Sequence, residues 1–362
     1  MKLIKLVIVC LAGLLPLSAA AMDHSKPQLL DDKFYKEYWE QHFLFEDGTF
    51  VTAQFLAANF PWPVGDDHGI MIATVVKPDG TRTIIKNGRD LGKWGFDAEK
   101  FSLFIHTHRL KQEDGIYDLH VGAPDKNAVN ATFSSAALPL DHMKFKRKKA
   151  SMESSIYLPF FEGSGNWQVQ QGEKEPLLTG AGKIQGFASH VLITGRLERV
   201  LNSWLRVGGL SGADNQPMPF LSAQERPDGS RDIILALKNA AGEITKFSDI
   251  SIDYQDIQQA PHKSSYPTVI KVMGHSETES LSGTIRLSRK IDHFNIYDHL
   301  NFFERSFAMF RASVANYRYI ADYDLLHTTA AGSQKLTGKA LSEYQDILNP
   351  REKKKPRRKK RR

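Results

Sequence analysis

The feature that most constrains this chain is a two-residue alternation of apolar and polar side chains, broken by short turns and repeated along most of its length. Residues 70–76 and 81–86 show it on either side of Lys77-Pro78-Asp79-Gly80. It recurs at 218–225, 232–238 and 243–247, with turn residues between the runs. Alternation of this kind predicts strands with one buried face. Many short strands joined by Asp-Gly turns predict an all-β fold of barrels or sandwiches.

Further strands and one helix complete this prediction. A hairpin is expected from 101–110 and 116–121, a second strand pair from 269–274 and 282–288, and two closing strands from 317–327 and 334–346. Helical spacing occurs only at 297–316, where one face carries the apolar residues Leu300, Phe303, Phe307, Phe310 and Val314. We expect this segment to form an amphipathic helix packed against a barrel.

The N-terminus has the pattern of a secretory signal peptide. Lys2 and Lys5 precede the apolar run 6–17, and small residues follow up to Ala21. The run is shorter than the roughly 20 apolar residues of a membrane-spanning helix. We therefore expect cleavage near Ala21 and a soluble protein in the periplasm or outside the cell. Cys10, the single cysteine, lies within the signal, so disulfides, thiolate metal ligands and cysteine nucleophiles are not expected in the mature chain.

About 340 residues remain after the signal, more than one hydrophobic core usually organises. The segment between Gly163 and Gly182 is polar and rich in glycine, so we place a domain boundary near Gly172. The expected domains are residues 22–171 and 172–350, followed by a separate tail at 351–362.

The basic character of the chain resides in that tail. The whole sequence has 48 Lys and Arg against 41 Asp and Glu; Arg351–Arg362 contributes ten basic residues and one Glu, and the signal two Lys. The body is thus mildly acidic, with 36 basic and 40 acidic residues. The tail is expected to be disordered. In an exported protein its expected partner is an anionic membrane surface rather than nucleic acid, and a merely solubilising extension is the alternative.

Two neighbouring segments of the expected 101–121 hairpin suggest a metal site. If the apolar residues of both strands share one face, His106, His108, Asp118 and His120 share the other. Cross-strand neighbours lie about 4.5–5.5 Å apart at Cβ, which suits imidazole and carboxylate ligands of a divalent metal. The alternative is a solvated outer face that binds nothing. Motifs for phosphate loops, HExxH zinc sites and EF-hands are absent, and no cofactor is expected.

Three short segments resemble a known superfamily. Gly186–His190 is followed by the Trp-containing Trp204–Gly208; Glu37–Phe43, with its aromatic residues, precedes Asp47-Gly48; and Lys335–Ala340 stands near the C-terminus. Together they are similar to the tandem lipocalin-like superfamily, which includes carotenoid 1,2-hydratase (hydroxyneurosporene synthase) and survival-factor proteins. The resemblance implies two lipocalin-like β-barrels side by side and an apolar cavity for a lipid or isoprenoid. It suggests His190, Trp204, Trp39 and Phe43 as ligand-binding residues.

The catalytic part of the resemblance is incomplete. Hydratase members of this superfamily usually carry an Asp-His pair, whereas this chain has Ser189 before His190 and Leu192 two residues later. Protonation of an isolated C=C bond needs a strong acid, and the local motif does not provide one. We therefore expect a protein that binds a hydrophobic ligand near a membrane. A hydratase- or cyclase-type lyase using His190, and a metal-dependent activity at the histidine cluster, remain open alternatives.

Overall fold

The computed structural model describes residues 27–60, 65–89, 92–97, 101–123, 126–140, 143–211, 216–261, 264–295 and 313–348. The first half of the chain forms a 12-stranded antiparallel sheet in the order β4-β3-β2-β1-β12-β11-β9-β8-β7-β6-β5, with β10 beside β11. We call it the first barrel, although its edges β4 and β5 are not joined. Its strands are β1 (Lys36–Phe45), β2 (Phe50–Phe60), β3 (Gly65–Val76), β4 (Arg82–Arg89), β5 (Trp94–Asp97), β6 (Ser102–Ile105), β7 (His108–Glu113), β8 (Ile116–Gly122), β9 (Ala128–Ser134), β10 (Met143–Arg147), β11 (Ala150–Val169) and β12 (Leu178–Thr194).

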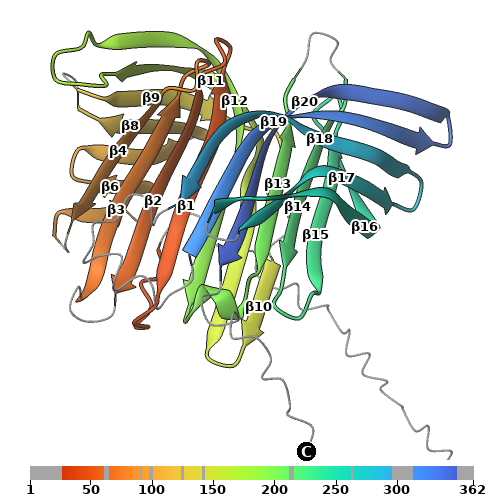
Figure 1. Cartoon of the computed structure of the whole chain (residues 1–362), viewed down its shortest axis with the longest axis horizontal. Coiled ribbons are helices and arrows are strands. Elements are labelled where there is room, and N and C mark those ends of the chain that lie inside the picture. The colour runs from red at the N-terminus through yellow and green to blue at the C-terminus, as the bar shows by residue number, and fades with distance from the viewer. Residues whose placement is uncertain are drawn as a thin grey trace, which may run out of the picture.

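The second half forms a closed barrel of eight consecutive antiparallel strands, which we call the second barrel. The two barrels lie side by side (Figure 1), and β1 of the first contacts β20 of the second. A short 3-10 helix, η1 (Leu197–Arg199), connects them. The strands of the second barrel are β13 (Ser203–Gly209), β14 (Met218–Glu225), β15 (Arg231–Lys238), β16 (Ile244–Gln259), β17 (Ser265–His275), β18 (Ser280–Asn295), β19 (Ser313–Thr329) and β20 (Gly332–Leu348).

Three layers of buried side chains hold this arrangement together. One apolar cluster fills the first barrel around Trp39, Phe43 and Phe161, and another fills the second barrel around Leu221 and Tyr323. The third lies between the barrels and contains side chains of both. The all-β fold expected from the strand pattern is therefore confirmed, as an open, curled sheet beside a closed barrel.

Strands β1 and β12 are buried on both faces because they lie between the two cores. They pair antiparallel, with Trp39 opposite His190 and Glu40 opposite Ser189. Neighbouring residues of a strand point to opposite sides of the sheet. The Trp39–His190 rung therefore faces the interior of the first barrel, and the Glu40–Ser189 rung faces the second barrel.

The passage between the two sheets falls in residues 195–202, not near Gly172. Of the glycines that suggested a linker, Gly163, Gly165, Gly180 and Gly182 belong to β11 and β12, and Gly172 lies in the connection between these strands. A Cβ on Gly163 would lie 2.0 Å from the carbonyl oxygen of Thr132, and one on Gly180 would lie 2.5 Å from the indole of Trp167. Glycine within a strand often marks such a close approach of neighbouring chain segments. These glycines serve close packing within the first barrel.

Two further predictions need correction. The expected helix 297–316 is not seen: residues 313–316 belong to β19, and 297–312 lie outside the described residues. The expected strand 101–110 is two strands, because the chain turns at His106, where φ is +58°, and continues as β7. The expected signal peptide, with Cys10, and the tail 351–362 also lie outside the described residues. Among the described residues, we find no helix long and apolar enough to cross a membrane.

Candidate functional site

A carboxylate and an imidazole meet inside the first barrel. Glu37 comes from β1 and His190 from β12, and the Oε1 of Glu37 lies 2.8 Å from the Nε2 of His190. Both side chains are fully buried, with 0% of their surface exposed. A buried Glu-His pair at hydrogen-bonding distance can hold one proton between its members and can pass it on. We call it the Glu37–His190 dyad.

Other groups fix the orientation of the dyad. The second carboxylate oxygen of Glu37, Oε2, accepts a hydrogen bond of 2.6 Å from the hydroxyl of Tyr35 and one of 2.7 Å from the backbone N–H of Gln28. The indole of Trp39 stacks on the His190 ring, with 4.3 Å between centroids and 15° between planes. Oε1 is thus directed at His190, and the imidazole has one face covered by an aromatic ring.

A second polar pair lies deeper in the same barrel. The amide of Gln41 donates a hydrogen bond of 2.8 Å to the hydroxyl of Tyr157. Tyr157 lies where the β11–β12 pairing is interrupted by register shifts next to His190, and such bulges often re-aim side chains near functional sites. Burial raises the pKa of Tyr157 well above its usual value and that of neighbouring Tyr117 to about 12. Both phenols are therefore neutral hydrogen-bonding groups at neutral pH.

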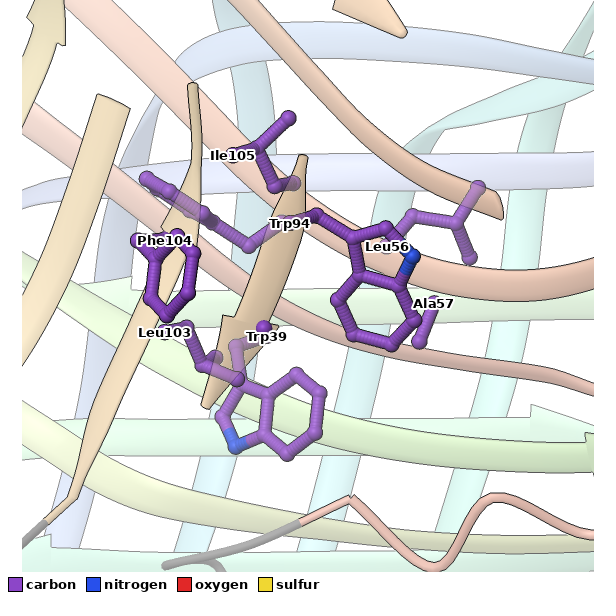
Figure 2. Close-up of a pocket in the computed structure, with 9 residues that line it drawn as sticks. Trp39, Leu56, Ala57, Trp94, Leu103, Phe104 and Ile105 are labelled. Carbon is purple, nitrogen blue, oxygen red and sulfur yellow. The ribbon is translucent and has the colours of Figure 1, made fainter. Parts of the chain in front are cut away.

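An apolar pocket opens beside Trp39. Figure 2 shows the indoles of Trp39 and Trp94 within it, with side chains of β2 and β6 around them. It lies where the opposite edges of the curled sheet approach each other, since β3 contacts both β5 and β6. The lining residues are Trp39, Phe55, Leu56, Ala57, Trp94, Gly95, Leu103, Phe104 and Ile105.

The pocket is small. The space open to the centre of a water molecule is about 10 Å³. A cavity needs roughly 10–15 Å³ by this measure to hold one water molecule. The pocket as it stands therefore admits at most the tip of a small molecule, not the complete isoprenoid or acyl chain that the family resemblance implied.

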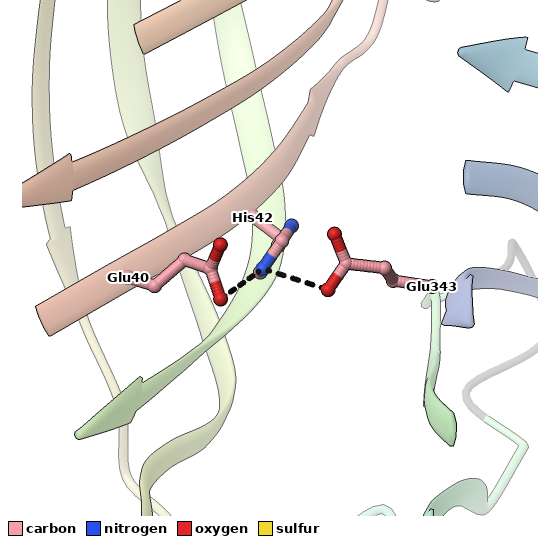
Figure 3. Close-up of side chains that lie close together, drawn as sticks. All are labelled: Glu40, His42 and Glu343. Carbon is pink, nitrogen blue, oxygen red and sulfur yellow. Dashed lines mark ion pairs between the residues drawn. The ribbon is translucent and has the colours of Figure 1, made fainter. Parts of the chain in front are cut away.

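A second polar cluster lies between the barrels. Figure 3 shows Glu40 and His42 from β1 beside Glu343 from β20, with the Nε2 of His42 3.1 Å from Glu40 and 3.7 Å from Glu343. Arg206 of β13 forms ion pairs with both carboxylates, at 2.8 Å from Glu40. All of these side chains are buried. Possible ligand atoms of the three residues of Figure 3 lie within 4.8 Å of one another, but the Arg206 guanidinium already supplies a positive charge to both carboxylates.

The cluster extends further across the interface. Arg318 binds Glu343 at 2.8 Å and Asp292 at 3.1 Å, and Arg82 of the first barrel binds Asp292 at 3.2 Å. Burial alone would raise the pKa of Glu40, but the charges of Arg206, His42 and Arg318 outweigh it and hold the pKa below its usual value. The pKa of Glu343 is lowered in the same way. Both carboxylates are therefore ionised at neutral pH.

The structure brings together three of the four residues suggested for ligand binding. His190, Trp39 and Phe43 lie inside the first barrel, Phe43 against Phe161 at 6.2 Å between ring centroids. Trp204 belongs to the layer between the barrels, where its indole N–H donates to the Ser222 hydroxyl at 2.8 Å. Trp94 lies at the pocket.

The expected metal cluster is not assembled. Because the chain turns at His106, the hairpin strands are β7 and β8, and His120 lies opposite Arg109. His108 is buried, and its ring contacts Asn87 at 2.9 Å and the Gly122 N–H at 2.8 Å. Asp118 binds Lys111, and His120 contacts Asn130. In the described part of the chain, His106, His108, Asp118 and His120 are not among the residues grouped closely enough to share one ion.

Sequence reasoning missed Glu37. It identified His190 but sought the acid next to it in the sequence, at Ser189. The acid lies 153 residues away, on the neighbouring strand β1. One signal pointed to it: a Glu at an inward-facing position beside Trp39 and Phe43 breaks the apolar alternation of β1.

Comparisons with known proteins support the fold. No protein-family model and no curated protein matches the sequence. Among solved structures, the chain is similar to CghA, with a TM-score of 0.58 and 11% identity over 88% of this chain and 89% of that one. CghA with Sch210972 gives 0.55 and 11% over 87% and 89%. A candidate AttH from Nitrosomonas europaea gives 0.53 and 14% over 91% and 97%. The fold expected from the superfamily resemblance is thus confirmed over most of the chain.

Proposed function

We propose that the first barrel binds a small unsaturated apolar molecule and that the Glu37–His190 dyad transfers a proton to it, as in hydration or cyclisation of a C=C bond. The observation that carries this proposal is a fully buried carboxylate–imidazole pair, 2.8 Å apart, under an indole that also lines an apolar pocket. A buried ionisable pair beside a pocket is a common feature of acid–base catalysts.

The chemistry follows from the surroundings of the dyad. In hydration, a proton from the dyad adds to one carbon of the C=C bond, water attacks the resulting cation, and the dyad regains a proton from that water. In cyclisation, a second C=C bond of the same molecule attacks the cation, and the new cation loses a proton to the dyad, so the product is an isomer of the substrate. The indoles of Trp39 and Trp94 can stabilise the cation through their faces, because Trp is the strongest cation–π partner. The dyad and the pocket together thus supply the acid, the base and an environment for the intermediate.

Ligand binding without chemistry is the second candidate. It is favoured by the apolar lining of the pocket, which needs no reactive group to hold an apolar molecule. The CghA structure with Sch210972 supports small-molecule binding by this fold, and it is compatible with either candidate. Burial of a few methylene groups contributes about 0.8 kcal/mol each, so a fragment-sized ligand binds only weakly in the pocket as it stands.

Isotope labelling distinguishes the two candidates. The purified protein is incubated with geraniol or farnesol in ¹⁸O-labelled water, and the products are analysed by mass spectrometry. Hydration adds one labelled water, and cyclisation gives an isomer with a different retention time. Native mass spectrometry of the same samples reports binding. Binding of these probes with neither product supports the second candidate and contradicts the first.

Both candidates predict that filling the pocket weakens ligand binding. Ala57 lines the pocket and is 3% exposed. Ala57→Leu adds three carbons to a space with room for about one water molecule, so we expect the affinity for geraniol to fall at least tenfold. Overpacking costs about 1–3 kcal/mol of stability, which a melting curve without ligand detects. An unchanged affinity in a folded variant places the ligand elsewhere.

The basic tail leads to a separate proposal about location. We propose that Arg351–Arg362 holds the exported protein at an anionic membrane surface, at about 1 kcal/mol for each basic residue near the surface. The exposed turn between β10 and β11, with Arg147, Lys148 and Lys149, adds positive charge to the body. Deleting 351–362 is expected to reduce sedimentation with phosphatidylglycerol vesicles strongly at low salt and little at high salt. Equal sedimentation of both proteins contradicts this role.

A further inference from the structure

The dyad lies one rung away from the ionic cluster between the barrels. In the β1–β12 ladder, Trp39 pairs with His190 and the next rung joins Glu40 to Ser189. The first rung faces the interior of the first barrel and the second faces the second barrel. A group that holds the Glu40–Ser189 rung therefore also fixes the backbone that carries Trp39 and His190.

Arg206 of the second barrel holds both members of that rung. Its Nη1 donates to the Ser189 hydroxyl at 2.7 Å, and its Nη2 lies 2.8 Å from the Glu40 carboxylate. The guanidinium is 0% exposed and stacks over the Trp204 indole at 4.4 Å. Glu343 binds the same nitrogen, Nη2. The planar guanidinium thus connects β12, through Ser189, with β1, through Glu40, in a fixed geometry. The flexible ammonium group of a lysine does not reproduce this geometry.

We propose that Arg206 is a positioning residue, supplied by the second barrel, that sets the geometry of the Glu37–His190 dyad in the first. The inference rests on the proposed function for its catalytic meaning. Proton transfer depends on the placement of the reacting groups, and an error of 1 Å can cost about 100-fold in rate. The side chains of a catalytic site must therefore be held within about 0.5 Å of their productive positions by the residues packed around them. On this reading the first barrel is complete as a site only when the second barrel is docked on it.

Two variants and one matched control test the inference. R206K retains the positive charge but loses the fork. Ser189→Ala removes only the hydroxyl that Arg206 contacts. This milder variant tests the same contact if R206K does not fold. The control is Ser264→Ala, which removes a buried hydroxyl that bonds to Tyr317 of the second-barrel core rather than to Arg206, Trp204 or the dyad. All are made in the full chain.

The first measurement is independent of activity. NMR spectra of protein labelled with ¹⁵N and ¹³C in histidine show the His190 ring, which is assigned from its loss in His190→Gln. We expect the His190 ring signals to shift in R206K and Ser189→Ala but to match wild type in Ser264→Ala. Unchanged His190 signals in both dyad-side variants, or equal shifts in the control, overturn the inference.

The second measurement is turnover of the probe used for wild type. We expect kcat to fall about 10- to 100-fold in R206K and less in Ser189→Ala, with KM changed less than twofold. An unchanged kcat in a folded R206K overturns the positioning role. If wild type converts no probe while the His190 signals respond as expected, the proposed function fails and the structural control of the dyad by Arg206 stands.

Discussion

Replacing Glu37 by Gln is expected to lower turnover of an unsaturated probe by a factor of about 10²–10⁴, the usual contribution of a positioned acid or base. The substitution preserves the shape of the side chain and leaves an oxygen that can still accept from Tyr35 and Gln28. It removes the negative charge that His190 contacts at 2.8 Å. The pair then no longer exchanges a proton, whereas the pocket remains apolar and intact. We therefore expect a loss in kcat with little change in KM.

A matched control exists in the second barrel. Glu279 and His327 form a similar pair, with 2.9 Å between Oε2 and Nε2, but it is partly exposed and far from the pocket along the chain. Glu279→Gln is expected to leave kcat unchanged. His190→Gln is expected to match Glu37→Gln, and the double variant should lose no more than either single one, because the two residues act as a unit. Wild-type turnover by folded Glu37→Gln contradicts the dyad mechanism.

The sequence predicts those parts of the fold that local rules determine. The predicted turn at Lys77–Gly80 is confirmed, because its conformation depends only on residues within and next to it. Gly80 has a φ of +84°, and the Lys77 N–H donates to the Thr81 carbonyl at 2.9 Å. The predicted meander of three strands, β14 to β16, is confirmed for the same reason. Alternation and turn chemistry act over a few residues, so they are readable without the tertiary structure.

Predictions that depended on distant neighbours were less reliable. The glycines from 163 to 182 resemble a linker, yet they permit close contacts between strands of one sheet. Glu40, His42 and Ser189 occupy positions that alternation assigns to an outer, solvated face. They are buried because another barrel covers that face. The pairing of Glu37 with His190 depends on β1 and β12 becoming neighbours, which no local pattern specifies.

Glu343→Gln is expected to cause the largest loss of stability, about 3–5 kcal/mol, the usual effect of removing one partner from a buried ionic cluster. Glu343 is 1% exposed and binds Arg206, Arg318 and the amide of Gln345. Without its charge, two buried guanidinium groups lose their shared anion. The control is Asp324→Asn, which breaks an ion pair with Lys335 in which both side chains are more than 60% exposed. Such a surface pair contributes at most about 1 kcal/mol. Urea unfolding at pH 7 measures both, and equal losses contradict the prediction.

Acid should reproduce the effect of this substitution in the wild-type protein. The pKa values of Glu40 and Glu343 lie below their usual 4.5 in the folded protein, because Arg206 and its neighbours outweigh the effect of burial. The unfolded chain therefore binds protons first as the pH falls. The stability that these groups contribute is complete above about pH 5 and is lost as the pH falls below about 4.5. Glu343→Gln lacks one of the two groups, so its stability should fall less steeply over this range. If the free energies of unfolding of the two proteins fall in parallel with pH, the ionic cluster does not hold the barrels together. The proposal that Arg206 positions the dyad would then lose its structural support.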